Sequence, residues 1–118
     1  MQLSKFTSSS LEIIAIYRSQ GGSYNDLNRY IEMMDSEEKT LLVIGDLNFC
    51  FSASGINPTK QFLERKNFIQ MIHEPTHIGG HILDQAYLRD CNHKLRWTAE
   101  TQSKYYTDHK GLAIIIRK

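Results

Sequence analysis

Segment 41–48, which reads LLVIGDLN, constrains the fold more than any other stretch of this sequence. Four consecutive apolar residues at 41–44 are typical of a strand that is buried on both faces. Gly45 then allows the backbone to turn, and Asp46 and Asn48 follow where the strand ends. In sheets covered by helices, ligands bind beyond the strand ends, so these side chains indicate a polar site. An Asx turn is the alternative, because Asp and Asn are ordinary turn residues.

Length and composition limit the chain to one soluble domain or a part of one. It has 118 residues, 41% of them apolar and only two of them proline, which favours a packed chain over disorder. A net charge of +1 gives no overall positive field, so any phosphate contact must come from a local cluster. Two cysteines are too few for a disulfide framework, and nothing resembles a signal peptide or a spanning helix. We therefore expect a soluble, intracellular protein without a membrane partner.

Strand and helix patterns alternate along the first half of the chain. Residues 11–17 are apolar and β-branched, which predicts a strand. Ser23 can cap a helix whose apolar residues repeat along one face, namely Tyr24, Leu27, Ile31 and Met34. Strand, helix and strand at this spacing form a βαβ unit, so we expect the first two strands to be parallel. Residues 1–10 are polar, rich in serine and without periodicity, and are expected to form a loop or a poorly fixed end.

The second half continues the pattern. Asn57 and Pro58 are typical of a helix start, with the helix itself at 59–67. Residues 82–88 alternate in polarity as a strand does, and Asp84 lies in the middle among apolar neighbours. An exposed position on an edge strand is the alternative interpretation of that carboxylate. Two further strands are expected, the first antiparallel to its neighbour, at 93–98 and 112–116. The predicted fold class is α/β, with a mixed sheet of roughly five strands and helices on one face.

Acidic and amide side chains cluster at three strand borders: Asp46 with Asn48, then Asp84, then Asp108 with His109. Hard cations such as Mg²⁺ take oxygen ligands from one or two carboxylates and leave room for water and phosphate. A neutral histidine nearby orients a phosphate or moves a proton at neutral pH, and an Asp on its other nitrogen fixes the tautomer. These residue types suit metal-assisted cleavage of a phosphodiester.

The order and spelling of these motifs resemble the endonuclease/exonuclease/phosphatase superfamily. The matching motifs are GDLN at 45–48, LD at 83–84 after two glycines, and TDH at 107–109, where serine is the usual first residue. Residues 16–19 look similar to the tyrosine-bearing strand end of its endonucleases, which implies that Tyr17 contacts the scissile phosphate. Together these motifs run in the right order from Leu11 to Ile116.

The resemblance implies a role for each remaining candidate. Asp46 would activate the attacking water or manage the leaving group, and would lie beside the metal. Asn48 would position the water and the phosphate. Asp108 would bind the Mg²⁺ or Mn²⁺ ion. His109 would contact the scissile phosphate, with Asp84 holding its imidazole, so the resemblance favours a functional Asp84 over the edge-strand alternative.

The superfamily fold is a four-layer α/β/β/α sandwich of two similar halves. Its first half carries an asparagine motif and the glutamate that is the principal metal ligand, and nothing before Tyr17 matches either. The sequence is therefore expected to be the C-terminal half of a DNase I-like sandwich. Residues 75–77 ahead of 83–84 look more like the endonuclease domains of mobile elements than like the inositol phosphatases.

The function that the resemblance implies is Mg²⁺-dependent cleavage of DNA, by a fragment that is inactive alone. A DNA substrate would also allow a nuclear location. Two alternatives stay open: a non-catalytic remnant that only binds partners or nucleic acid, and a phosphatase of a small phosphate ester. The sequence indicates no oligomeric state.

Two weaker patterns have ordinary explanations. A basic and aromatic surface along a nucleic-acid strand is one interpretation, and a solvated strand and loop is the other, for Arg96, Trp97, Lys104, Tyr105, Tyr106 and Lys110. Cys50 follows the central strand closely, but no base or cation neighbours it, so we interpret it as a packing residue.

Overall fold

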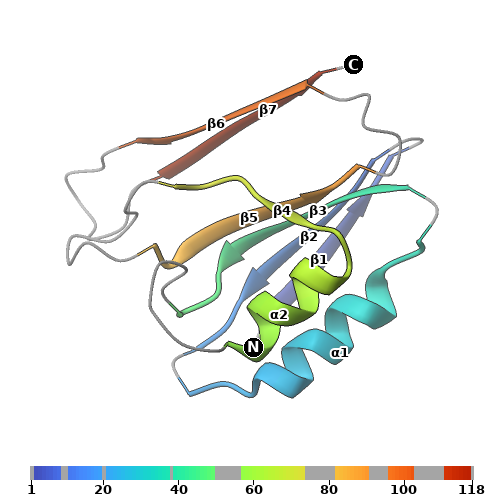
Figure 1. The fold of residues 1–118 in the computed structure, drawn as a ribbon, viewed down its shortest axis with the longest axis vertical. Helices are drawn as coiled ribbons and strands as arrows, with labels where there is room; N and C mark the ends of the chain where they lie inside the picture. The colour runs from blue at the N-terminus through green and yellow to red at the C-terminus, as the bar shows by residue number, and fades with distance from the viewer. Residues whose placement is uncertain are drawn as a thin grey trace.

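The computed structural model describes residues 2–8, 11–19, 21–37, 39–49, 57–73, 82–90, 96–102 and 111–117. Its elements are β1 (Gln2–Thr7), β2 (Leu11–Tyr17), α1 (Tyr24–Met34), β3 (Thr40–Asp46), α2 (Pro58–Arg65), β4 (Ile69–Gln70), β5 (Asp84–Arg89), β6 (Arg96–Gln102) and β7 (Gly111–Arg117). A five-stranded sheet has the order β1-β2-β3-β5-β4, and β6 pairs with β7 in a second sheet. Figure 1 shows the two helices on one side of the large sheet and the β6–β7 pair on the other. The predicted fold class, α/β with a mixed sheet and helices on one face, is confirmed.

Strand β3 is the centre of the large sheet. It runs parallel to β2 on one side and antiparallel to β5 on the other. Leu41 and Val43 are fully buried in the cluster under the helices, while Leu42 is 5% exposed in the cluster on the opposite face. This two-sided burial explains the unbroken apolar run, and the predicted βαβ unit with parallel strands is confirmed.

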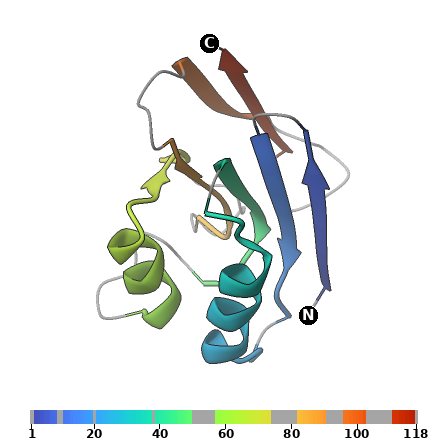
Figure 2. The same cartoon turned by 90° about the vertical axis from the view of Figure 1, so that its right-hand side faces the viewer.

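Both helices begin where the sequence predicts. The Ser23 side chain accepts the backbone N–H of Asp26 at the start of α1, and Asn57 caps α2 in the same way ahead of Pro58. The helices lie side by side against the sheet (Figure 2), and bury Leu27 and Leu63 there. No helix in the described part of the chain is long and apolar enough to cross a membrane.

The β6–β7 pair covers apolar residues on the other face of the large sheet. Half-buried Trp97 of β6 packs there against a cluster that includes Leu42, Ala86 and Leu88. The interpretation of Trp97 as an exposed aromatic on a solvated strand is therefore wrong. Arg96 beside it is exposed, and the other four residues of that pattern lie outside the described residues.

The prediction of a loop or a poorly fixed end at 1–10 is wrong for Gln2–Thr7, which forms β1. This strand pairs antiparallel with β2 along its whole length, from Gln2 opposite Tyr17 to Thr7 opposite Glu12. Only Leu3 among its side chains is even half-buried, so the strand has no apolar alternation to detect. Backbone pairing at the sheet edge holds it, together with an ion pair of 2.8 Å between Lys5 and Glu12.

Candidate active site

Three of the predicted site residues form one row across neighbouring strands. Tyr17 of β2 is the register partner of Asp46 of β3, which is also the register partner of Asp84 of β5. Register partners project to the same face of a sheet, and neighbouring strands lie about 4.8 Å apart. We call Tyr17, Asp46 and Asp84 the site row. Tyr17 and Asp84 therefore flank Asp46 on one face of the sheet, each one strand away from it.

The site row lies on the face that the helices do not cover. Side chains alternate along a strand, so Asp46 shares its face with Leu42, which belongs to the cluster under β6–β7. Tyr17 is 47% exposed, and Asp46 and Asp84 are half-buried. The row is therefore polar and partly open to solvent, and it lies next to the apolar cluster around Leu42 on the same face.

Asp84 is half-buried, whereas the edge-strand interpretation expects an exposed side chain. Strand β5 lies between β3 and β4, and five of its six residues are buried. Asp84 stands at the first position of β5, opposite Asp46, whereas the short β4 pairs with β5 at Tyr87 and Leu88. The Asp84 carboxylate is therefore partly withdrawn from solvent at the end of β5 that faces Asp46.

The turn after β3 is an Asx turn, so the alternative proposed for Asp46 and Asn48 is also present. The backbone N–H of Asn48 donates to Oδ1 of Asp46 at 3.0 Å, and Asn48 has a left-handed φ of 54°. The side-chain nitrogen of Asn48 donates to the carbonyl of Arg18 at 2.7 Å. The turn and the site row share Asp46, which means that the turn orients the carboxylate of the row.

Gly45 permits the close strand contact beneath this turn. Its φ is 152°, and a Cβ at this position would lie 1.8 Å from the carbonyl oxygen of Ile16. Only glycine fits a backbone approach of this kind. Beyond it, Leu47 donates its N–H to the carbonyl of Leu83 at 3.0 Å, which continues the β3–β5 pairing past the row.

Two buried polar side chains hold the turn, and neither role was predicted from the sequence. Arg18 is 3% exposed and donates to the carbonyls of Leu47 and Asn48. Gln85 is fully buried and donates to the carbonyl of Phe49 at 2.6 Å. Its Oε1 accepts the hydroxyl of Tyr87, and burial raises the pKa of that phenol well above its usual range. The one sequence feature that could have indicated such a role is a polar residue between the apolar residues of a strand, as at Gln85.

The donor chemistry of the row fits a hard divalent cation. Asp46 and Asp84 contribute carboxylate oxygens, and Mg²⁺ binds in proteins through one or two carboxylates with water and phosphate completing its shell. Among the residues that the structure describes, no group of three or more His, Cys, Asp and Glu side chains is placed to hold a metal ion. Asp108 and His109, the predicted metal ligand and phosphate contact, lie outside the described residues, as does Cys50.

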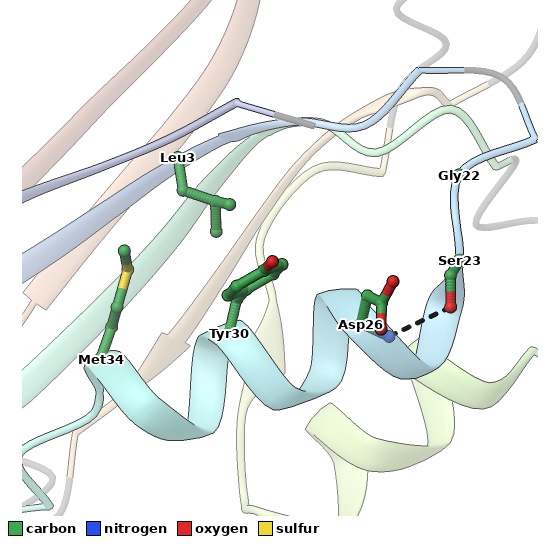
Figure 3. Close-up of a pocket in the computed structure, with 6 residues that line it drawn as sticks. All are labelled: Leu3, Gly22, Ser23, Asp26, Tyr30 and Met34. Atoms are coloured by element: carbon green, nitrogen blue, oxygen red, sulfur yellow. Dashed lines mark hydrogen bonds between the residues drawn. The ribbon is translucent and has the colours of Figure 1, made fainter.

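A separate open pocket of about 550 Å³ lies on the opposite, helix-bearing side. In Figure 3, Leu3 projects from β1 toward Tyr30 and Met34 of α1, with Ser23 and Asp26 at the far end of the pocket. Asp26 is the only charged side chain in its described lining. The pocket therefore lacks the convergent polar groups of the site row.

Comparisons with known proteins show the fold. No protein-family model matches the sequence, and no curated protein matches it. A solved structure of the cytolethal distending toxin from Haemophilus ducreyi aligns with a TM-score of 0.71 at 19% identity, over 98% of this chain and 52% of that one. The toxin from Actinobacillus actinomycetemcomitans aligns with a TM-score of 0.70 at 21% identity, over 96% of this chain and 52% of that one.

The chain thus spans about half the length of the solved structures that it matches. At this level of identity the likeness shows the fold alone, which is part of a DNase I-like α/β fold. The fold does not distinguish a mobile-element endonuclease from other proteins that share it.

Proposed function

We propose that this chain is the C-terminal half of a Mg²⁺-dependent phosphodiesterase that cleaves DNA inside the cell. The observation that carries the proposal is the site row, which brings Tyr17, Asp46 and Asp84 to one open end of the sheet. The order of the motifs and the DNase I-like fold support the same reaction class. The spelling at 75–77 and 83–84 favours nicking on behalf of a mobile element over hydrolysis of a small phosphate ester.

The reaction is hydrolysis: a water oxygen bonds to phosphorus, the bond from phosphorus to the leaving oxygen breaks, and the water proton passes to a base. Asp46 would take that proton or return one to the leaving oxygen. Asp46 and Asp108 would hold the Mg²⁺ ion. When bound, the ion stabilises negative charge on the phosphate oxygens.

The other side chains bind and orient the phosphate. Tyr17 presents an exposed phenol that can donate to a phosphate oxygen. The NH₂ group of Asn48 has two N–H bonds, and with one donated to the Arg18 carbonyl the second is available to the phosphate or the water. His109 would contact the same phosphate, with Asp84 fixing its tautomer.

Metal binding tests this proposal directly on the 118-residue chain. Titration with millimolar Mg²⁺ or Mn²⁺ should selectively shift or broaden the backbone amide signals of Asp46, Asn48 and Asp84. Binding should be weak, because few carboxylates are present to offset dehydration of the ion. Asp46→Asn should abolish the effect, whereas Asp26→Asn, at an exposed acid on α1, should leave it unchanged. Perturbation spread evenly over all surface acids would count against the site.

Nicking of supercoiled DNA separates the catalytic half from the alternatives. We expect no nicking by the chain alone, because the glutamate-bearing half supplies the principal metal ligand. Robust nicking that Asp46→Ala abolishes would refute the proposed dependence on that half. Binding of DNA with no metal-selective change at the site row would favour the non-catalytic binding module.

A further inference from the structure

Arg18 is a buried cation held entirely by neutral acceptors. The Arg18 residue is only 3% exposed to solvent. Each of the five N–H bonds of its guanidinium has an oxygen partner. Those partners are the carbonyls of Leu47, Ser19, Gly22 and Asn48 and the hydroxyl of Tyr24. The guanidinium also lies over the ring of Tyr24, 4.3 Å from its centroid. Burial of a charge is costly, so complete satisfaction of its donors is what permits Arg18 to occupy this position.

One peptide group connects Arg18 to the site row. Arg18 Nε donates to the carbonyl oxygen of Leu47 at 2.8 Å. The N–H at the other end of the same peptide belongs to Asn48 and donates to Oδ1 of Asp46 at 3.0 Å. A cation at the carbonyl end polarises the peptide and strengthens the hydrogen bond made by its N–H. Two hydrogen bonds therefore link the guanidinium of Arg18, through this peptide group, to the carboxylate of Asp46.

Further contacts close this linkage into a clamp. The carbonyl of Arg18 accepts the side-chain N–H of Asn48, while its Nη2 donates to the carbonyl of the same residue. The backbone N–H of Arg18 donates to the carbonyl of Asp46 at 2.9 Å. Asn48 is thus held from both its side chain and its backbone in a left-handed conformation that few residues adopt.

The geometry points to Arg18 as a positioning residue for the site: it fixes the peptide between Leu47 and Asn48, and through it the carboxylate of Asp46 and the amide of Asn48. Arg18 does not touch the phosphate in this arrangement, because its five donors are already bound inside the protein. The role of Asp46 and Asn48 toward phosphate and metal rests on the function proposed above. The contacts by which Arg18 holds these two residues do not depend on that function.

Hydrogen exchange of the Asn48 backbone amide tests the clamp. Arg18→Met should raise its exchange rate by about tenfold or more, since a hydrogen bond to a charged group is lost from the chain. Amides in the middle of β2 and β3 should keep their protection. Arg18→Lys retains the charge with fewer, differently directed donors and should give an intermediate rate. Arg29→Met, at an exposed arginine on α1, is the matched control and should change nothing.

A second readout is the affinity for Mn²⁺, measured from broadening of the Asp46 and Asn48 amide signals. Arg18→Met should weaken it by about threefold or more and Arg18→Lys by less, because a loosely held carboxylate binds a metal less well. A purely structural role would lower overall protection without a graded change in metal affinity. If the wild-type chain binds no Mn²⁺, the proposed function fails, and the exchange measurement still decides the role of Arg18.

The unaltered protein provides a test that does not depend on folding of a variant. The Nε–H of Arg18 should exchange far more slowly than that of Arg29, and its NMR signal should shift in Asp46→Asn. An Asn48 amide that is unchanged in Arg18→Met, or that changes in parallel with every other amide, would overturn the inference. So would an Arg18 Nε–H that exchanges as fast as that of Arg29.

Discussion

The two ends of the five-stranded sheet place acidic side chains in different surroundings. At the end where β2 and β3 begin, described carboxylates pair with cations. Glu12 lies 2.8 Å from Lys5, and Asp35 forms a two-pronged ion pair with Arg89. Side-chain exposures of 4% for Glu12 and 6% for Asp35 show that both are removed from water. The ion pairs at this end connect β1 with β2, and β5 with the residues after α1.

At the end where β2 and β3 finish, the described contacts are of a different kind. Asp46 and Asp84 stand opposite each other in register, and the buried cation nearest in sequence, Arg18, binds carbonyl oxygens. Two like charges directly opposite are unfavourable in a sheet, and burial of a guanidinium among neutral groups is costly. The two ends therefore differ in the described contacts that hold them: ion pairs at the first, which we call the paired end, and an Asx turn with a buried guanidinium at the second, the site end.

Gly45→Ala should have the largest effect of the changes considered, because it tests the backbone contact on which the site end depends. The new Cβ would lie 1.8 Å from the Ile16 carbonyl oxygen, so two central strands must separate. We expect a loss of unfolding free energy on the order of 4 kcal/mol, or failure to fold. Gly21→Ala is the matched control: its φ is also positive, at 84°, but nothing lies within 4 Å, and about 1 kcal/mol is expected from backbone strain. If Gly45→Ala and Gly21→Ala lost the same unfolding free energy in urea, the close contact with Ile16 would not be the cause of the destabilisation.

Asp35→Asn should destabilise the chain by about 3 kcal/mol, since it leaves Arg89 buried without its anion. Burial raises the pKa of Asp35, but the hydrogen bonds from Arg89 and from the Glu37 backbone, together with nearby positive charge, more than offset this and hold the pKa below its usual value. Replacement of both partners by apolar residues, in the double variant Asp35→Leu and Arg89→Met, should cost less than the single change. A double variant at least as unstable as Asp35→Asn would mean that the pair itself, rather than the orphaned charge, stabilises this end.

The parts of the fold that were predictable have local causes. Ser23 and Asn57 cap helices through their own side chains, and the apolar run at 41–44 records burial on both faces of one strand. Strand β1 has no apolar pattern in its sequence, because its stability comes from backbone pairing with β2. Trp97 was misjudged for a related reason: its surroundings are set by a sheet that packs across the molecule.

The candidate site divides in the same way. Asp46, Asn48 and Asp84 stood out because polar side chains at strand borders are visible in the sequence. Their convergence required the register between three strands, which no local pattern encodes. Arg18 and Gln85 were missed because a buried polar residue is indistinguishable from an exposed one until its partners are known.

Acid should weaken the paired end by about 1 kcal/mol through Glu12. Hydrogen bonds from Lys5 and Ser36 hold the pKa of Glu12 below its ordinary value of 4.5. Because the folded pKa is the lower one, this stability is fully present above the unfolded pKa and is lost as the pH falls through the folded value. Glu12→Gln should therefore flatten the fall in unfolding free energy below about pH 5. Identical pH profiles of the two proteins would remove this ion pair from the account of the paired end.

Tyr17→Phe should have the smallest effect on stability, within about 0.5 kcal/mol of zero, because its side chain is nearly half exposed at the site end. Tyr87→Phe is the contrasting change, since its buried hydroxyl donates to Gln85, and its loss should cost about 1–2 kcal/mol. Urea unfolding of both variants measures the difference. A large loss in Tyr17→Phe would show that the phenol supports the fold. No loss would mean that the fold does not depend on this hydroxyl, which leaves it available for the phosphate contact proposed above.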